Sequence, residues 1–490
     1  MMGEKGTKGP MFCYVTLEQL VPQDHFLRSI LDVVDFSFIR GKVKHLYSHT
    51  GQPSVDPVVL IKIMLIGYLY DITSERRLMQ EIQVNLAYRY FIGYELEETI
   101  PDHSTLSKNR NQRFKDSTFQ KIFDEIVSQC KAYGLIEGDE IAFDSTAVQA
   151  NASLSSLEPR KVELRPDEYI KKVAQENPVE DDEDQKETSK SKDSKKKVKL
   201  TNKDHVSKTD PDCAITKKPG KGVMLAYSNH LGVDTKERII VGVVATPSDV
   251  SDDKLLIPML ERASEKFGIE PKRIIADTKY GTAANFKELD DMGAEAFIPV
   301  QKYKNKKGLF DQDDFSFYPK EDVFICPEGK RLEFFRYGKT KDTRRYRAEK
   351  SDCLSCPQRC KCTTSKNGRM VDRNIHQDLM DKAKARMKTP RGKRAAKRRM
   401  TTSETINAEA KTCHGLTRCR YRGQDNAQKQ FLMTALTQNI KRMVQAVLRQ
   451  RAKAEEMAME IHEKTVAFIA QIHKALRPSI LDYQGAIERG

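Results

Sequence analysis

The alternation of apolar and polar residues first divides the chain into helical stretches. From residue 11 to about residue 131, apolar residues recur every three or four positions, which predicts amphipathic helices packed on one another. Asp56 before Pro57, and Ser74 before Glu75, are typical helix starts. We therefore predict an all-α domain over residues 1–135.

Shorter apolar runs then predict a sheet. Ile141 to Phe143 forms a first strand, and two longer runs on either side of the polar turn Asp234–Glu237 predict a hairpin. Amphipathic helical patterns and two more strands follow, the last of them ending near Gln301. This order predicts an α/β core, a mixed sheet flanked by helices, whose first part spans residues 136–301.

Two stretches interrupt the pattern. Residues 154–221 are so rich in charge that we expect disorder or a surface loop. Periodicity is lost again over residues 302–398, which we interpret as an inserted subdomain. Helical pattern resumes for residues 399–450, expected to complete the core, and continues in residues 451–490 as a C-terminal helical extension.

Composition points to a polyanionic partner. The chain of 490 residues has 85 Lys and Arg against 70 Asp and Glu, a net charge of +15, so nucleic acid is the first candidate. No apolar stretch is long enough to span a membrane, and the N-terminal residues lack the apolar core of a signal peptide. We expect a cytoplasmic protein without membrane contact.

Two aspartates end strands in the same way. Asp144 follows Ile141–Phe143, and Asp277 follows the strand before Gly281. Taken alone, Asp144 could equally cap the next turn. If the two strands are neighbours, however, both carboxylates can share divalent cations, as two-metal phosphoryl transfer requires. Hard oxygen ligands favour Mg²⁺ or Mn²⁺.

A third acid is expected on a helix that lies against this sheet. Glu404 fits, because Lys411 returns to the same helix face two turns later. Glu409 is the competing acid. Lys411 and the following arginines, Arg418, Arg420 and Arg422, would then face DNA phosphates.

Two other segments are candidates for phosphate binding. The helix expected to open at Pro101 carries Lys108, Arg110 and Arg113 at positions that can share a face, although a solvated basic surface is an equally good interpretation. Residues 382–399 are strongly basic and lead directly into the proposed Glu404 helix. Phosphate binding beside the active site is the sharper interpretation of this run.

The inserted subdomain contains a cysteine cluster. Cys326, Cys353 and Cys356, with one of Cys360 or Cys362, can supply four soft ligands for a structural Zn²⁺ ion. We take Cys360 as the fourth ligand. Reduced thiols without metal are the alternative.

Three sequence blocks together resemble a known family, the DDE transposases of bacterial insertion sequences, which have an RNase H-like catalytic core. The run DSTAVQANAS at Asp144 resembles the family's D-[GS]-T followed by A-N-A-S, and TDPDC at Thr209–Cys213 resembles T-D-P-[DE]-A. ADTKYGT resembles A-D-x-G-Y-x-S, with Asp277 as the second acid and Lys279 where glycine is usual.

The third block resembles R-x-x-x-V-E-x-x-F-G-x-x-K followed by G and RG. Arg399, Glu404 and Lys411 match it, whereas Asn407 and Ala408 stand where phenylalanine and glycine are common. The N-terminal helices are similar to the family's helical transposase domain. The resemblance implies that Asp144, Asp277 and Glu404 bind the catalytic cations. It also assigns DNA contacts, which with the basic residues above comprise Lys108, Arg110, Lys279, Tyr280, Arg399, Lys411, Arg418 and Arg422.

The implied activity is nicking of the element's ends and joining of the freed 3′-hydroxyl to target DNA. The implied partners are the inverted-repeat ends, target DNA and a second copy of the chain in a homodimer, acting at the bacterial nucleoid. Two alternatives stay open. One is a decayed or domesticated transposase that only binds DNA, and the other is a nuclease on the same core without strand transfer.

Overall fold

The computed structural model describes residues 15–114, 116–160, 200–218, 220, 222–301, 308–338 and 342–487. Its first part is helical, as predicted. The elements are α1 (Leu17–Leu20), α2 (Phe26–Val33), α3 (Phe38–Val43), η1 (Lys44–Leu46), α4 (Pro57–Leu69), α5 (Glu75–Val84), α6 (Leu86–Ile92), α7 (His103–Lys108), η2 (Asn109–Arg113) and α8 (Asp116–Ala132).

Both predicted helix starts are capped as their residues suggest. The Asp56 side chain accepts a hydrogen bond from the Val58 N–H, and Ser74 accepts one from Arg77. Helix α4 is apolar on nearly all sides and is buried among the other helices. These helices therefore share one hydrophobic core.

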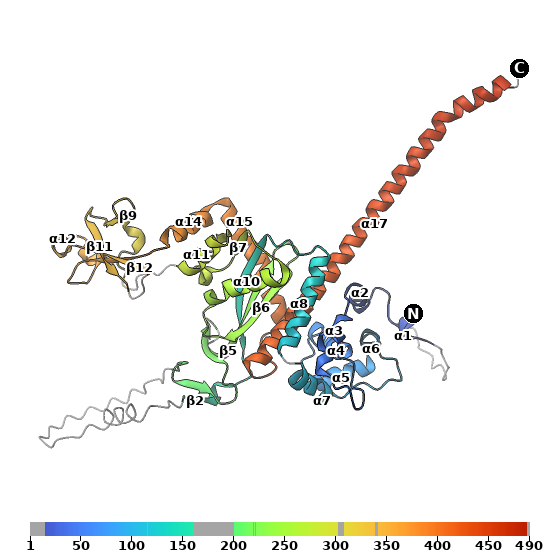
Figure 1. Ribbon diagram of the computed structural model, residues 1–490, viewed down its shortest axis with the longest axis horizontal. Coiled ribbons are helices and arrows are strands. Elements are labelled where there is room, and N and C mark those ends of the chain that lie inside the picture. The colour runs from blue at the N-terminus through green and yellow to red at the C-terminus, as the bar shows by residue number, and fades with distance from the viewer. Residues whose placement is uncertain are drawn as a thin grey trace, which may run out of the picture.

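A six-stranded mixed sheet forms the centre of the molecule (Figure 1). Its order is β4-β5-β1-β7-β8, and β6 pairs with β5 beside β4. Strand β5 is antiparallel to β1, β4 and β6, whereas β1, β7 and β8 are parallel. The bounds are β1 (Glu140–Gln149), β4 (Ala214–Lys218), β5 (Gly222–Asp234), β6 (Ile240–Pro247), β7 (Arg273–Ile275) and β8 (Glu295–Phe297). The predicted hairpin is β5–β6.

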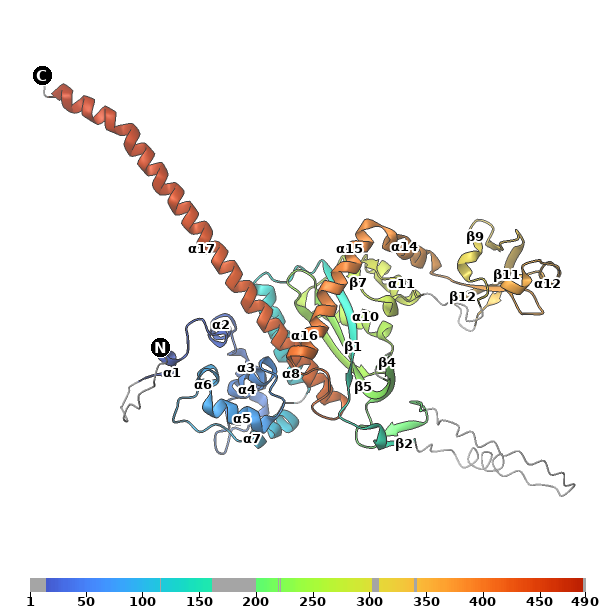
Figure 2. The ribbon, with the colours of Figure 1, turned by 180° about the vertical axis from the view of Figure 1, so that it is seen from behind.

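Helices cover both faces of this sheet. Successive residues of a strand point to opposite faces, so Phe143 packs in the cluster that contains Met259 of α10, and Ala142 packs with Ala395 of α15. Figure 2 shows α15 and α16 beside β1. The helices after the N-terminal part are α10 (Leu256–Phe267), α11 (Ala283–Asp291), α14 (Gln377–Lys388), α15 (Pro390–Arg399), α16 (Thr405–Cys413) and α17 (Gln424–Ile487).

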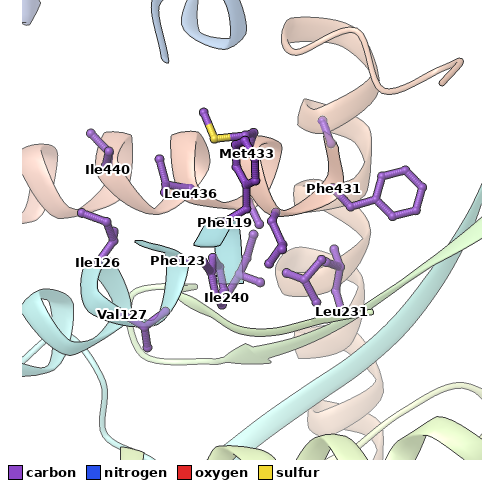
Figure 3. Packing of buried hydrophobic residues seen from close by; sticks show 14 of the residues in the cluster. Phe119, Phe123, Ile126, Val127, Leu231, Ile240, Phe431, Met433, Leu436 and Ile440 are labelled. Carbon is purple, nitrogen blue, oxygen red and sulfur yellow. The ribbon is translucent and has the colours of Figure 1, made fainter. Parts of the chain in front are cut away.

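Helix α17 joins the two parts of the molecule. Figure 3 shows its residues Met433, Leu436 and Ile440 facing Phe119 and Phe123 of α8, all within one buried cluster. The same helix covers the outer edge of β6. Asn439 exchanges two hydrogen bonds of 2.8 Å with the Ile240 backbone, and Gln428 and Gln424 bind the backbone of Val243 and Ala245.

Beyond Val447 the helix leaves the body of the molecule (Figures 1 and 2). Exposed apolar side chains along this part include Met457, Ile461 and Phe468. Among the helices that the structure describes, none is both long and apolar enough to cross a membrane.

The stretch between β8 and α14 contains a second sheet, where the loss of periodicity predicted only an inserted subdomain. Figure 1 shows it beyond α14, apart from the main sheet. Its five antiparallel strands follow the order β13-β12-β11-β10-β9. The bounds are β9 (Ser316–Tyr318), β10 (Val323–Ile325), β11 (Arg331–Tyr337), β12 (Thr343–Ala348) and β13 (Met370–Asn374), with α12 (Lys350–Leu354) and α13 (Arg359–Cys362) between β12 and β13.

The highly charged stretch 154–221 is partly ordered. Its ends form η3 (Leu154–Ser156), β2 (Leu157–Pro159), β3 (His205–Ser207) and β4, and β4 is an edge strand of the main sheet. Residues 161–199, on which the expectation of disorder mainly fell, lie outside the described residues. The expectation of a disordered or surface loop is therefore wrong for β4.

Candidate active site

The pairing of β1 with β7 positions Asp144 and Asp277. Strand β1 continues past Asp144 to Gln149, so the expectation that Asp144 ends its strand is wrong, whereas Asp277 does follow the end of β7. The parallel register places Ala142 beside Ile275, so Asp144 and Asp277 follow at matching positions, two residues further along each chain. The Asp277 charge acts on the Asp144 carboxyl, as expected for neighbouring acids. The two aspartates thus meet at one edge of the sheet.

Asp144 is largely buried. Its Oδ1 accepts the Ser145 backbone N–H at 2.9 Å, and its Oδ2 accepts a hydrogen bond from Asn407 Nδ2 at 3.1 Å. Burial raises the pKa of Asp144 above its usual value, against the opposing charge of Arg399, and the nearby Asp277 adds to the rise. A cation beside Asp144 would favour its ionised form.

Asp277 begins the short turn η5 (Thr278–Tyr280) and is half-buried. Its Oδ1 accepts the Lys279 N–H at 2.9 Å. Asp277 thus caps this turn and also lies beside Asp144.

Glu404 lies at the end of η7 (Met400–Glu404), a π-helical turn between α15 and α16 that packs on β1 and β5. Arg399 links it to the sheet. One guanidinium nitrogen is 2.6 Å from Glu404 Oε1, and the other is 3.7 Å from Asp144 Oδ1. The structure therefore brings Glu404 toward Asp144, with Arg399 between them.

Asn407 contributes a contact that the sequence did not reveal. It is buried and donates to Asp144, while its own Oδ1 has no hydrogen-bond partner within the described residues. The departure from the family pattern at this position therefore places an amide directly on the first acid. Its position three residues after Glu404, nearly one helical turn, was the available signal.

The helices α15 and α16 dock along one face of β1. Glu140, Ala142, Asp144 and Thr146 share this face because of the period-2 alternation. Arg398 donates to Glu140, and Lys411 donates to Thr146. Lys411 thus reaches the face of β1 that carries Asp144.

Asp252 is a further acid of the site that sequence reasoning missed. It is buried and accepts hydrogen bonds from Ser145 Oγ and from Lys279 Nζ, each at 2.7 Å. Its Oδ1 is 3.5 Å from His230 Nδ1, and burial lowers the pKa of His230 to about 4, so the imidazole is neutral at pH 7. These residues border an open hollow next to Ser145.

Glu409, the competing third acid, is part of a different network. It lies 2.6 Å from Arg442, 2.7 Å from Lys441 and 3.5 Å from His414, between α16 and α17. Burial alone would raise the pKa of Glu409, but the His414 hydrogen bond and the charges of Arg442 and Lys441 hold it well below its usual range. This geometry assigns Glu409 to packing of the two helices.

Two of the predicted DNA-binding residues are buried, which corrects those assignments. Arg110 stacks on Tyr421 at 3.5 Å and pairs with Glu75, so it joins the N-terminal helices to the segment before α17. Tyr280 is almost fully buried beside Phe143. The sequence gives the residue type but not its burial, which depends on elements far along the chain. Lys108, in contrast, is exposed.

The other predicted contacts reach solvent to differing degrees. Arg418 and Arg422 are exposed over Asn151, and Lys279 is mostly exposed beside Asp252. In the basic run, Arg391 pairs with Glu295 and Arg398 with Glu140, so part of its charge faces the sheet. Lys393, Arg394 and Lys397 of α15 are exposed.

The cysteines of the second sheet differ in their exposure to solvent. Cys362 is buried, Cys326, Cys353 and Cys356 are half-buried, and Cys360 is exposed. Over the part of the chain that the structure describes, no three His, Cys, Asp or Glu side chains are placed to hold a metal ion as they stand.

Comparison with known families gives two matches. Residues 15–112 match a family described as "Transposase domain (DUF772)", and residues 325–444 match one described as "Transposase DDE domain". The second match includes Glu404, Asn407 and Lys411. No curated protein matches the sequence.

A solved structure is weakly similar. It is described as a "Cryo-EM structure of piggyBac transposase synaptic complex with hairpin DNA". The likeness covers 87% of this chain and 79% of that one, at 8% sequence identity and a TM-score of 0.28. A TM-score this low carries no argument about the fold or the site.

Proposed function

We propose that this chain, two parts of which match families of transposase domains, is a DDE transposase that nicks the ends of an insertion sequence and joins the freed 3′-hydroxyl to target DNA. The observation that carries this proposal is the meeting of Asp144 and Asp277 in register on neighbouring parallel strands, under the turn that carries Glu404. The mixed sheet, with three parallel strands beside an antiparallel hairpin and helices on both faces, supports an RNase H-like core.

The chemistry of the acids around Asp144 suits divalent cations, although their side chains do not enclose a metal position as they stand. Asp144, Asp277 and Glu404 offer only oxygen ligands, which suit Mg²⁺ or Mn²⁺. The buried Asn407 Oδ1, which has no hydrogen-bond partner among the residues that the structure describes, adds a further oxygen next to Asp144. When bound, such ions would activate the attacking hydroxyl and stabilise the leaving oxygen.

The surrounding residues position the acids and the DNA. Asn407 and the Ser145 N–H fix the Asp144 carboxylate, and Arg399 offsets the charges of Asp144 and Glu404. We assign Arg399 and Lys279 to the phosphates flanking the cleaved bond, because each carries a positive charge at the rim of the site. In this role, Arg399 turns from the carboxylates to DNA.

The DNA path continues over basic surface. Lys393, Arg394 and Lys397 extend it along α15, and Arg418 and Arg422 extend it past the end of β1. Contacts of this kind are made to the phosphate backbone of DNA, and the binding affinity falls steeply as the salt concentration rises. A homodimer would present two such paths to two ends of the element.

The test is cleavage and joining of DNA that carries the inverted repeats, in Mg²⁺, by Asp144→Asn and Asp277→Asn. Each substitution should lower the rate by about a thousandfold, equivalent to several kcal/mol of transition-state stabilisation. Asp139→Asn is the matched control, since Asp139 precedes β1 but pairs with the exposed Lys272. It should cleave at the wild-type rate.

The outcome also separates the alternatives. Cleavage without joined product indicates a nuclease on the same core, and binding without either product indicates a decayed transposase. Full activity of Asp144→Asn would overturn the proposed site. Glu404→Gln and Glu409→Gln then distinguish the third acid: the first should lose activity and the second should lose stability.

A further inference from the structure

Three of the five cysteines between β10 and β13 gather at the core of the second sheet, and Cys356 lies near them. Cys362 is buried in that core, and Cys326 and Cys353 pack against it. Burial raises the pKa of the Cys362 thiol, and the thiols of Cys353, Cys326 and Cys356 act on it as close neighbours. Cys360 lies outside this group, with its side chain in solvent.

The turn after β10 is shaped around the sulfur of Cys326. The Cys326 N–H donates to the Lys330 carbonyl at 2.9 Å, the Gly329 N–H donates to the Cys326 carbonyl at 2.9 Å, and the Lys330 N–H donates to Cys326 Sγ at 3.3 Å. Gly329 has a φ of 74°, which a glycine adopts without strain. A backbone N–H aimed at sulfur stabilises the thiolate, the form that binds metals.

A second sulfur is held in the same way. The Arg369 N–H donates to Cys353 Sγ at 3.4 Å. The Arg369 side chain also donates to the carbonyl of Cys362 at 2.9 Å and to that of Phe310 at 2.6 Å. Arg369 therefore links the first and the last of the cysteines between β12 and β13 to Phe310, which precedes β9.

The second sheet also needs a cross-link. Its core cluster has few fully buried members, namely Phe315, Phe324, Leu332, Tyr346, Ala348, Cys362 and Val371. The helices α12 and α13 are only five and four residues long. Small units with so little buried apolar surface depend on disulfides or structural metals, and the described cysteines here are free.

We propose that Cys326, Cys353, Cys356 and Cys362 bind one structural Zn²⁺ ion, with Cys362 in place of the exposed Cys360. Four thiolates at a turn and two short helices match tetrahedral zinc. The side chains do not enclose a metal position as they stand, so binding requires rotation of the cysteine side chains toward one another. The proposal concerns the second sheet and is independent of catalysis.

The test is the metal content of the full-length protein, purified without chelator from medium that contains zinc. The wild-type protein and Cys360→Ser should each hold about one zinc per chain. Cys362→Ser should lose most of it. Cys360→Ser is a closely matched control, because it removes a thiol two residues away in the same short helix.

A measurement on the wild-type protein gives a result that does not depend on whether the variants fold. Exchange of the bound metal for Co²⁺ should give the thiolate-to-cobalt absorption of a tetrahedral site, and Cys360→Ser should give the same spectrum. Absence of zinc and of this absorption in the wild-type protein would overturn the proposal. So would zinc that is lost in Cys360→Ser but retained in Cys362→Ser, or bound iron in place of zinc.

Discussion

The main sheet and the second sheet are built by contrasting means. The main sheet is buried between helices from both halves of the chain, and one continuous hydrophobic cluster runs from α2 through β1 and β5 to α17. The second sheet has its own small cluster, and its surface contacts are between arginines and aromatic rings, such as Arg347 over Phe335 at 3.8 Å.

The two sheets should therefore differ in how far the effect of a local defect spreads. Elements distant in sequence hold the main sheet together, so a destabilising substitution in one of them should lower the stability of the whole sheet. The second sheet is held by neighbours in sequence, so damage there should remain local. Its place between β8 and α14 nevertheless connects both of its ends to the part of the molecule that carries the proposed active site.

The same substitution in the two cores gives the sharpest contrast. Phe431→Ala and Phe324→Ala each remove a fully buried ring, a change that costs about 3–5 kcal/mol. Phe431→Ala should lower the melting temperature of the whole molecule. Phe324→Ala should unfold the second sheet alone, seen as rapid hydrogen exchange limited to β9–β13. Faster exchange in β1 and β5 of Phe324→Ala would show that the two sheets fold as one unit.

The Glu409 network should be nearly as costly to break. Glu409→Ala leaves the buried guanidinium of Arg442 without its carboxylate, which costs about 3–5 kcal/mol. Chemical denaturation measures the loss. Glu460→Ala is the control, since Glu460 forms an exposed pair with Lys464 on the outer part of α17, and such pairs contribute about 0–1 kcal/mol. Equal losses in both variants would contradict the structural role of Glu409.

Acid should destabilise the main sheet through His230. An unfolded histidine binds a proton below about pH 6.5, whereas burial keeps the folded His230 neutral to about pH 4. The unfolded state therefore gains protons first, and stability falls with decreasing pH across this window, by up to about 3 kcal/mol. His230→Asn should flatten this dependence in denaturation at pH 7 and pH 5. His462→Asn, at an exposed position, should leave it unchanged.

The smallest effect expected is at Asn407. Asn407→Ala removes the hydrogen bond to Asp144 and should weaken Mg²⁺-dependent cleavage by about tenfold, as residues that support metal ligands do. The Mg²⁺ concentration that gives half-maximal rate should rise, and the melting temperature should change little. Ala408→Ser, on the exposed side of the same helix turn, is the control. An unchanged Mg²⁺ dependence in Asn407→Ala would remove Asn407 from the site.

Apart from β4, which lies in the highly charged stretch, the main sheet was predictable because its strands contain apolar runs separated by amphipathic helices. The hairpin β5–β6 and helix α10, which ends at Gly268, follow the pattern closely. The second sheet was missed because its strands are rich in Arg and aromatic residues, and their exposed faces hide the alternation.

Within the site, the acids could be found but their surroundings could not. Asp144 and Asp277 each follow a short apolar run, a local signal, although β1 continues past Asp144 to Gln149. The roles of Asp252 and Asn407 depend on which elements pack together, and no spacing reveals that. Arg110 and Tyr280 were assigned to DNA from residue type and a sequence pattern, although tertiary packing buries them.

The amide side chains along the edge of β6 have a consequence for synthesis. Strand β6 leaves the ribosome long before Gln424, Gln428 and Asn439, whose amides later occupy its free backbone groups. During this interval, the edge is an open template on which another nascent chain can add a strand. Chains that stop before α17 should therefore aggregate. Once α17 has been synthesised and has packed on β6, it completes the core and covers the exposed edge.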